Sequence, residues 1–232
     1  MTCGKEDDIK GGHESGTPLD AAALRKALLV YAVTDRAWLG GKSLSEQVED
    51  ALKGGASFIQ LREKELDESA FLKEAFEIKK LAQQYKVPFV INDNVEIAIQ
   101  CGADGVHVGQ SDMRAAAVRK RLGENKILGV SVSTVEEAIQ AVKDGADYLG
   151  VGAVFSTLTK SDADQVSYNQ LKEICNAVTI PVVAIGGITR ENIDQLYGSG
   201  IQGVALVSAI FGAENIQQAT NQLVVLAKQL SV

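Results

Sequence analysis

Short apolar runs alternate with amphipathic stretches along the chain from residue 28 onward. The short runs have the length and composition of buried strands, and the stretches between them have the spacing of helices. Strands are expected at 28–34, 58–62, 88–91, 105–108, 127–131, 148–151, 181–185 and 203–207. Helices are expected at 44–53, 68–85, 95–100, 112–122, 135–143, 168–178, 193–197 and 216–230. This alternation predicts an α/β protein that folds as a (β/α)8 (TIM) barrel.

A weak internal repeat supports the barrel. A glycine-led segment precedes every second expected strand, and these segments recur at intervals of roughly 45–55 residues, the length of two strand–helix units. The glycines are Gly55, Gly102, Gly145 and Gly200. Each is expected to end the preceding helix in a left-handed cap. The alternative is a doubly wound open sheet, but no Gly-x-Gly-x-x-Gly motif follows the first run.

The amino-terminal region is expected to be a flexible tail followed by a short helix. Residues 1–16 are polar and lack the apolar segment of a signal peptide. Thr17 is a candidate helix cap, with Pro18 at the first helical position and Asp20 at the third, so a helix is expected to reach about Lys26. Residues 17–232 are therefore predicted to form a single barrel domain.

Composition and charge narrow the classes of function. Apolar residues make up 46% of the 232 residues, and the net charge is −7 with no basic block. This balance argues against nucleic-acid and membrane-surface partners. No apolar run approaches the roughly 20 residues of a membrane helix. The three cysteines are scattered without the spacing of a metal site, so they are expected to be ordinary thiols. Free thiols are typical of a reducing compartment, so we expect a cytoplasmic protein. The sequence leaves open whether it forms a homo-oligomer.

The second expected strand carries the strongest chemical signal. Ile59 and Leu61 fall on one side of this strand, and Gln60, Arg62 and Lys64 fall on the other. In a barrel covered by helices, the polar side projects into the interior near the carboxyl end of the strand. Two cations that converge there need an anion, for which we expect a phosphate or diphosphate. The alternative is a solvated edge strand whose cations extend into water.

Two carboxylates follow neighbouring strands at the same end of the barrel. Asp93 follows the third expected strand and Asp112 follows the fourth, so both can approach one cation. Hard oxygen ligands beside a phosphorylated substrate favour Mg²⁺. The alternative is that each caps a helix, since Glu96 lies three residues after Asp93 and a helix is expected at Asp112.

Later loops offer further candidates for anion binding. The longest loop, 152–167, contains Thr157 and Lys160, which could close over phosphates. Gly186 and Gly187 follow the seventh strand, and Val207 with Ser208 follows the eighth, which is the usual phosphate site of such barrels. Ser131 ends the fifth strand and could donate to an anion, whereas His107 lies between two valines and is expected to line the core.

In combination, these motifs resemble the thiamine-phosphate synthase family. They are YAVTD at 31–35, QLREK at 60–64, ND at 92–93, GVHVGQ at 105–110 with Asp112, GVS at 129–131, TLTK at 157–160, GGI at 186–188 and VSA at 207–209. They occur in the order of the family and cover nearly the whole chain after the tail. The resemblance implies a (β/α)8 barrel transferase of thiamine biosynthesis. It would join hydroxymethylpyrimidine diphosphate to thiazole phosphate, giving thiamine phosphate and diphosphate.

The resemblance also implies roles for individual residues. Those expected to hold the pyrimidine diphosphate are Gln60, Leu61, Arg62, Glu63, Lys64 and Asn92, with help from Ser131 and Lys160. Those expected to hold the thiazole phosphate are Thr157, Leu158, Thr159, Gly187, Val207 and Ser208. Asp93 and Asp112 would bind one Mg²⁺, and Arg62, Lys64, Ser131 and Lys160 would act in catalysis. Two positions depart from the family pattern: Asn94 stands where many members have aspartate, and Ser156 where many have proline.

Two other functions remain open at this point. One is a thiazole tautomerase, in which His107 would carry the proton. A related alternative is a barrel that binds a thiazole or thiamine phosphate without catalysing a reaction. A Schiff-base aldolase would use Lys64, but the sequence around it suggests no apolar pocket to activate the amine.

Overall fold

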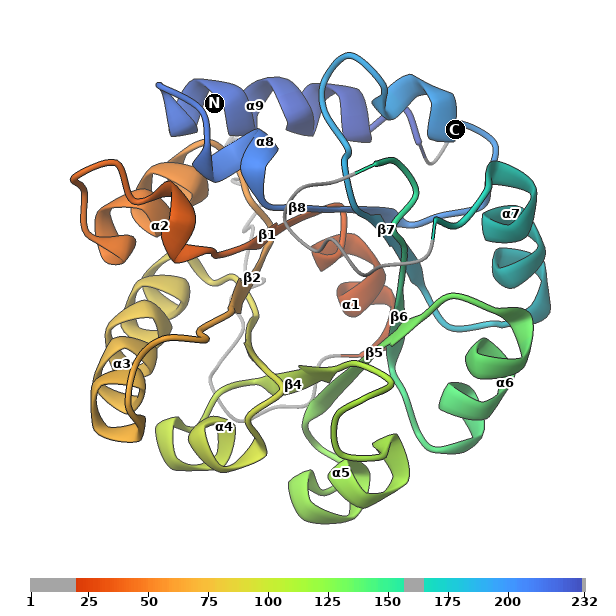
Figure 1. The fold of residues 1–232 in the computed structure, drawn as a ribbon, viewed down its shortest axis with the longest axis horizontal. Coiled ribbons are helices and arrows are strands. Elements are labelled where there is room, and N and C mark those ends of the chain that lie inside the picture. The colour runs from red at the N-terminus through yellow and green to blue at the C-terminus, as the bar shows by residue number, and fades with distance from the viewer. Residues whose placement is uncertain (1–19, 157–164, 231–232) are drawn as a thin grey trace, which may run out of the picture.

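The strands close into a barrel. The computed structural model describes residues 20–156 and 165–230, and within them eight parallel strands pair in chain order, with β8 closing onto β1 (Figure 1). The strands are β1 Val30–Val33, β2 Phe58–Leu61, β3 Phe89–Asn92, β4 Gly105–Val108, β5 Ile127–Val132, β6 Tyr148–Val151, β7 Val182–Ile185 and β8 Gly203–Leu206. The predicted (β/α)8 barrel is confirmed, and the open sheet is excluded.

Helices surround the barrel in the expected order. They are α2 Leu44–Lys53, α3 Glu68–Tyr85, α4 Val95–Cys101, α5 Ala115–Leu122, α6 Val135–Lys143, α7 Tyr168–Ala177, α8 Ser208–Phe211 and α9 Ile216–Ala227, with 3-10 turns η1 Arg36–Trp38 and η2 Ile193–Leu196. Most expected boundaries agree within a few residues. The helix expected from residue 112 begins at Ala115, and the segment expected to be helical at 193–197 is a 3-10 turn.

A short amino-terminal helix lies across one end of the barrel. This helix, α1 Ala21–Ala27, begins after Asp20, whose side chain accepts a hydrogen bond from the backbone of Ala23. The expectation that Thr17 caps the helix is therefore wrong, because Asp20 itself is the extended N-cap residue. Leu24 and Leu28 pack against the side chains that fill the barrel, so α1 closes its amino-terminal end (Figure 1). The predicted tail, 1–16, lies outside the described residues.

The apolar core has two layers, as strand alternation requires. Ile59 and Leu61 belong to the layer between the strands and the surrounding helices. Tyr31, Phe58 and Tyr148 belong to the layer inside the barrel, where their rings meet edge to face. Because Gln60 lies between Ile59 and Leu61, it faces the interior, as predicted.

The repeated glycines have the conformation that the repeat predicts. Gly55, Gly102, Gly145 and Gly200 all have positive φ, between 66° and 100°. Each ends the segment before an even-numbered strand in a backbone region that other residues adopt at a cost. In the part of the chain that the structure describes, no helix is both long and apolar enough to cross a membrane.

Candidate active site

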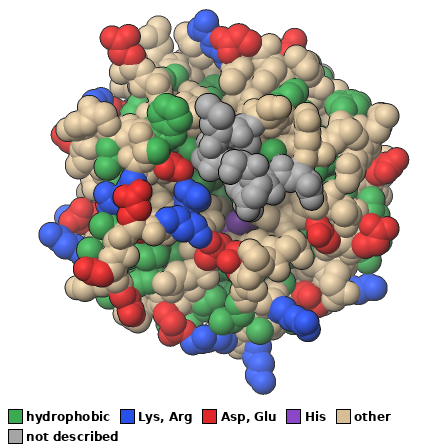
Figure 2. All heavy atoms as spheres, viewed as in Figure 1, with side chains coloured by type: hydrophobic (Ala, Val, Ile, Leu, Met, Phe, Trp, Pro, Cys, Tyr) green, Lys and Arg blue, Asp and Glu red, His purple; other side chains and the backbone are tan. Residues whose placement is uncertain are grey.

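A cavity of about 470 Å³ opens at the carboxyl ends of the strands. This is the end at which barrel enzymes place their active sites. Figure 2 shows this face, on which basic and acidic side chains lie next to one another near its centre. Of the residues that the sequence singled out, those lining the cavity are Gln60, Arg62, Lys64, Asn92, Asp93, His107, Asp112, Ser131, Gly186, Gly187, Val207 and Ser208. The structure therefore brings together positions from six strands.

Two residues of the 60–64 motif do not line the cavity. Leu61 is fully buried in the layer under the helices, as period-two alternation demands. The Glu63 carboxylate instead accepts hydrogen bonds from the backbone of Lys64 (2.7 Å), Glu65 (2.6 Å) and Leu66 (3.1 Å). Glu63 also pairs with Arg36. Residues 157–160, predicted to contact both substrates, lie outside the described residues.

Asp93 lies at the end of β3 in an unusual backbone conformation. Its φ is +60°, in the left-handed region that residues other than glycine seldom adopt. Its carboxylate accepts hydrogen bonds from the ammonium of Lys64 and the amide of Asn92, both at 2.6 Å. Asn94 is the N-cap of α4 and accepts from the backbone of Ile97. Asp93 is therefore turned toward the cavity and does not cap a helix.

The role of Asn94 explains one departure from the family pattern. Asparagine and aspartate cap helices about equally well, because each offers a side-chain oxygen to the first turn. The residue at this position serves the start of α4 and not the cavity, so the change from aspartate leaves the group at Asp93 intact.

Asp112 meets Asp93 from the loop after β4. Its carboxylate accepts a hydrogen bond from the backbone of Gly109 at 2.8 Å, and α5 begins only at Ala115. Burial raises the pKa of Asp112, and its hydrogen bond with Asp93 adds to the rise. Two carboxyl groups this close repel each other once both are ionised. The pair therefore favours a proton or a cation between its oxygens.

The two carboxylates have the donor chemistry that Mg²⁺ prefers. Protein sites commonly hold Mg²⁺ through one or two carboxylates, with waters and substrate phosphates completing the shell. Asp93 and Asp112 fit this arrangement, since both line the cavity beside the cations of β2. Within residues 20–156 and 165–230 no cluster of three or more metal-ligating side chains occurs, so phosphate oxygens would have to supply further ligands.

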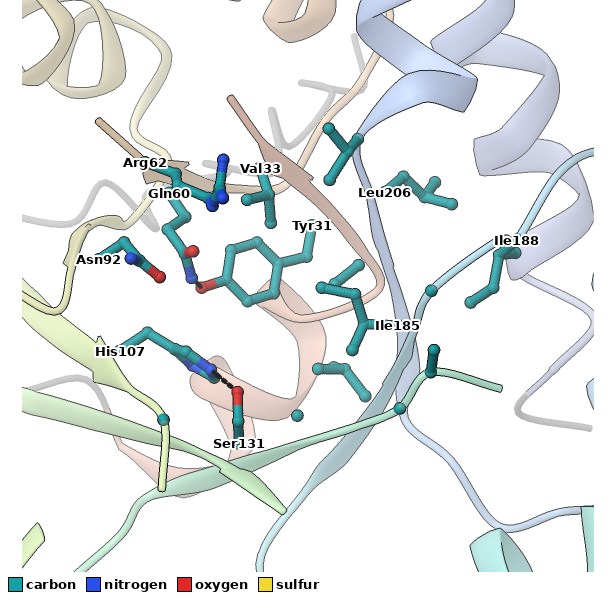
Figure 3. A pocket seen from close by; sticks show the side chains of 18 of the residues that line it. Tyr31, Val33, Gln60, Arg62, Asn92, His107, Ser131, Ile185, Ile188 and Leu206 are labelled. Carbon is teal, nitrogen blue, oxygen red and sulfur yellow. Dashed lines mark hydrogen bonds between the residues drawn. The ribbon is translucent and has the colours of Figure 1, made fainter. Parts of the chain in front are cut away.

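Arg62 is held by a carboxylate that sequence reasoning did not single out for the site. Its guanidinium pairs with Asp35 at 2.8 Å, and its side chain is 29% exposed. Asp35 follows β1, the neighbour of β2 in the barrel. Asp35 is the last residue of the YAVTD motif and directly follows the first expected strand, and this position could have identified it as a site residue. Figure 3 shows Arg62 beside the cavity and near Gln60.

Lys64 is ion-paired and half exposed. Its side chain is 53% exposed and its ammonium contacts the Asp93 carboxylate. A Schiff-base lysine needs an apolar setting that favours the neutral amine. Lys64 instead lies half exposed beside a carboxylate, so that apolar setting is not found here, which argues against the aldolase alternative.

His107 lines the cavity floor and is also hydrogen-bonded. Its Nε2 lies 2.9 Å from the hydroxyl oxygen of Ser131, and its Nδ1 lies 2.9 Å from the hydroxyl oxygen of Tyr148 (Figure 3 shows the Ser131 contact). The expectation of a core-lining histidine is correct in position. The sequence did not reveal the two tyrosines beneath it, because Tyr31 and Tyr148 sit in strands that read as uniformly apolar.

The loops after β6 and β7 touch without intervening side chains. Gly186 and Gly187 have φ of 100° and 63°. A Cβ atom on Gly186 would lie 2.5 Å from the Cβ of Ala153, and one on Gly187 would lie 2.4 Å from the carbonyl oxygen of Ser156. Glycine is therefore required here by close approach as well as by conformation. This contact closes the wall of the cavity opposite the carboxylates.

Known proteins resemble this chain over most of its length. The sequence model of the family described as thiamine monophosphate synthase matches residues 30–210. The chain is 50% identical over 194 residues to the thiamine-phosphate synthase of Clostridium botulinum (strain Eklund 17B / Type B), which covers 84% of this chain and 91% of that protein. It is 51% identical over 194 residues to the thiamine-phosphate synthase of Ruminiclostridium cellulolyticum, which covers 84% and 92%. The solved structure of thiamine phosphate pyrophosphorylase from Pyrococcus furiosus superposes with a TM-score of 0.83 at 38% identity, covering 89% of this chain and 98% of that chain.

Proposed function

The chain belongs to the thiamine monophosphate synthase family, and from this premise we propose how its cavity performs the transfer. The protein is a transferase of thiamine biosynthesis. The reaction joins 4-amino-2-methyl-5-hydroxymethylpyrimidine diphosphate to 4-methyl-5-(2-phosphoethyl)thiazole. The products are thiamine phosphate and diphosphate. The observation that carries the mechanism is the convergence of Arg62 and Lys64 with the Asp93–Asp112 pair on one cavity.

The pyrimidine diphosphate binds on the side of the cavity formed by β2 and β3. Arg62 and Lys64 supply the positive charges there, and Gln60 and Asn92 add amide groups that can bind the ring or the phosphates. Leu61 and Glu63 would act only through their backbone, since their side chains turn elsewhere. Lys160 remains a predicted partner of the diphosphate.

Asp93 and Asp112 would hold one Mg²⁺ beside the diphosphate. When bound, the ion would neutralise charge on the phosphate oxygens as that charge grows. Burial and the neighbouring Asp93 raise the pKa of Asp112, so a bound cation would offset the charge of the ionised pair. Lys64 contacts Asp93, so its ammonium would lie beside the diphosphate that the ion holds.

The thiazole phosphate binds at the opposite wall. Gly187, Val207 and Ser208 line the cavity in the loops after β7 and β8, where barrels of this kind commonly bind phosphate. Residues 157–159 remain predicted contacts of the same phosphate. A ligand held at each wall would place its reacting carbon or nitrogen near the centre of the cavity.

The chemistry needs charge stabilisation more than proton transfer. The bond between the pyrimidine methylene carbon and the diphosphate oxygen breaks, and its electron pair leaves with the diphosphate. The thiazole nitrogen then donates its lone pair to that carbon, and no proton has to be removed. Fixed cations aimed at the leaving oxygens stabilise the charge that develops. The absence of a required base agrees with the cavity, in which His107 is engaged by Ser131 and Tyr148.

Known relatives favour this synthase over a thiazole tautomerase or a non-catalytic regulator. The curated relatives are thiamine-phosphate synthases at about half identity over most of the chain. The cytoplasmic location stays a prediction, and whether the protein forms a homo-oligomer stays open.

Mixing the purified protein with both substrates tests the proposal. We expect diphosphate and thiamine phosphate to form in equal amounts, only when both substrates are present and only with Mg²⁺. Chelation by EDTA should abolish the reaction and added Mg²⁺ should restore it. Release of diphosphate at the same rate in EDTA would refute the metal assignment.

An isosteric pair of variants separates the site from the scaffold. Asp93→Asn keeps the shape and the tolerance of left-handed φ but removes the charge, so turnover should fall on the order of 10²–10³-fold. Asp144→Asn, at the C-cap of α6 and at the amino-terminal end of the barrel, should retain normal turnover. Equal rates in the two variants would reject the role given to Asp93.

A further inference from the structure

An unbroken chain of hydrogen bonds crosses the floor of the cavity from β2 to β5. The Gln60 amide nitrogen lies 2.5 Å from the Tyr31 hydroxyl, and that hydroxyl lies 2.8 Å from the hydroxyl of Tyr148. Tyr148 contacts Nδ1 of His107 at 2.9 Å, and Nε2 of His107 contacts Ser131 at 2.9 Å. Figure 3 shows the first and last links, with Gln60 and Ser131 on opposite sides of the cavity.

The amide at one end sets the direction of the first link. An amide nitrogen can only donate, so the Tyr31 oxygen must accept from Gln60. Tyr31 is 1% exposed, and within residues 20–156 and 165–230 the other hydrogen-bond partner of its hydroxyl is Tyr148. The Tyr31 proton therefore goes to the Tyr148 oxygen. Reversing this link would leave a buried hydroxyl proton without an acceptor, which costs about 1–3 kcal/mol.

The direction then passes through the second tyrosine to the histidine. Tyr148 accepts from Tyr31, so its own proton points to Nδ1 of His107. Burial raises the pKa of Tyr31 and of Tyr148, so both hydroxyls keep their protons at neutral pH. With Nδ1 acting as an acceptor, the ring proton of His107 lies on Nε2 and points to the oxygen of Ser131.

We propose that Gln60 fixes the polarity of this chain, which holds His107 as the Nε2–H tautomer and makes Ser131 a hydrogen-bond donor to the bound ligand. Ser131 lines the cavity, and because its oxygen accepts from His107, its own proton can be donated to an acceptor there. Tyr31, Tyr148 and His107 are positioning residues that act through Ser131. The identity of the acceptor rests on the proposed function: it is an oxygen or a ring nitrogen of the pyrimidine diphosphate.

This polarity has a chemical consequence for His107. A ring nitrogen that already carries a proton cannot remove one from a ligand. Nε2, the nitrogen on the Ser131 side, is in that state, and Nδ1 is covered by Tyr148. This chain of hydrogen bonds therefore agrees with a transfer reaction that needs no general base, and it prevents His107 from removing a proton from the ligand.

The tautomer can be measured directly, without substrate. The full chain contains two histidines, His13 and His107, so the long-range ¹H–¹⁵N spectrum of labelled protein shows two imidazole patterns. A His13→Gln variant assigns them. We expect His107 to show a protonated Nε2 and an unprotonated, hydrogen-bonded Nδ1. An Nδ1–H tautomer, or a ring protonated at both nitrogens at neutral pH, would overturn the proposal whatever activity the protein has.

Removing the link before the histidine gives a second readout. Tyr148→Phe should shift the Nδ1 resonance of His107 toward that of an unbonded nitrogen. Tyr85→Phe, a matched change at a hydroxyl on α3 that contacts Glu49, should leave the resonance unchanged. If the Nδ1 resonance does not shift in Tyr148→Phe, or shifts equally in both variants, the proposed chain of hydrogen bonds is wrong. The wild-type spectrum keeps the proposal testable if Tyr148→Phe fails to fold.

A double-mutant cycle separates positioning from a structural effect. Ser131→Ala should lower kcat on the order of 10²-fold, and Tyr148→Phe about 10-fold. If Tyr148 acts through Ser131, the double variant loses no more than Ser131→Ala alone. Losses that multiply would show an independent structural role and overturn the assignment. Synthase activity in the wild type is the separate test of the proposed function.

Discussion

At the scale of single residues, the backbone of Asp93 is the most informative feature. A left-handed φ costs a residue with a Cβ about 1–2 kcal/mol, and such strain tends to persist at functional sites. Asp93 combines this conformation with contacts to Asn92, its chain neighbour, and to Lys64, which follows the adjacent strand β2. The sequence predicted its place after a strand. It could not predict the strain, nor distinguish Asp93 from a helix cap, because only the structure shows that Asn94 caps α4.

Two substitutions at this position measure the strain. Asp93→Gly and Asp93→Ala both remove the carboxylate, so both should lose most turnover. Glycine relieves the backbone and alanine does not, so the free energy of unfolding should be about 1 kcal/mol higher in Asp93→Gly. Urea denaturation of the two variants checks this difference. A more stable Asp93→Ala would show that the left-handed backbone is not under strain.

At the scale of elements, the loop between β2 and α3 is shaped by one carboxylate. Glu63 accepts from three successive backbone groups and pairs with Arg36, so it fixes the turn that carries Lys64 to the cavity. The family motif implied substrate contact for Glu63. Strand alternation placed Gln60 and Arg62 correctly, but it does not continue into a loop, where hydrogen bonds decide the direction of each side chain.

The protonation of Glu63 should therefore affect stability with pH. Burial alone would raise the pKa of this carboxyl, but the backbone donors and the Arg36 guanidinium outweigh burial and lower it. Folding thus favours the charged form. Its contribution is complete above the ordinary value of 4.5 and is lost as the pH falls through the lowered pKa.

Glu63→Gln tests this linkage. The variant should be about 1–3 kcal/mol less stable than wild type at pH 7, and the gap should narrow as the pH falls below about 4. Glu65→Gln, an exposed neighbour, is the control and should differ little at either pH. Denaturation curves over this pH range provide the measurement. A gap that stays constant down to pH 3 would contradict the predicted direction.

At the scale of the whole molecule, the barrel separates stability from chemistry. The order of strands and helices was predictable because the strands are short and mostly apolar and many turns are marked by glycine or a helix cap. The role of α1 was not, because a seven-residue helix with one buried leucine gives no sign of which end of the barrel it covers. Leu24 and Leu28 pack beneath the barrel interior, at the end away from the cavity.

A cavity-forming change in this region should affect folding alone. Leu28 is fully buried, so Leu28→Ala should lower the free energy of unfolding by about 2–5 kcal/mol. The KM values and kcat of the folded variant should stay close to wild type, because the reacting groups lie at the opposite end. Thermal unfolding and steady-state kinetics below the transition check both parts. A large rise in either KM with little loss of stability would show that the two ends are coupled.

Because α1 covers the amino-terminal end of the barrel, it also limits where substrates can enter and products can leave. In the described structure that end of the barrel is filled by side chains, so we expect both substrates and both products to pass through the opening of the cavity at the carboxyl ends of the strands. We expect that a product still held in the cavity prevents the next pair of substrates from binding, so added thiamine phosphate or diphosphate should inhibit turnover.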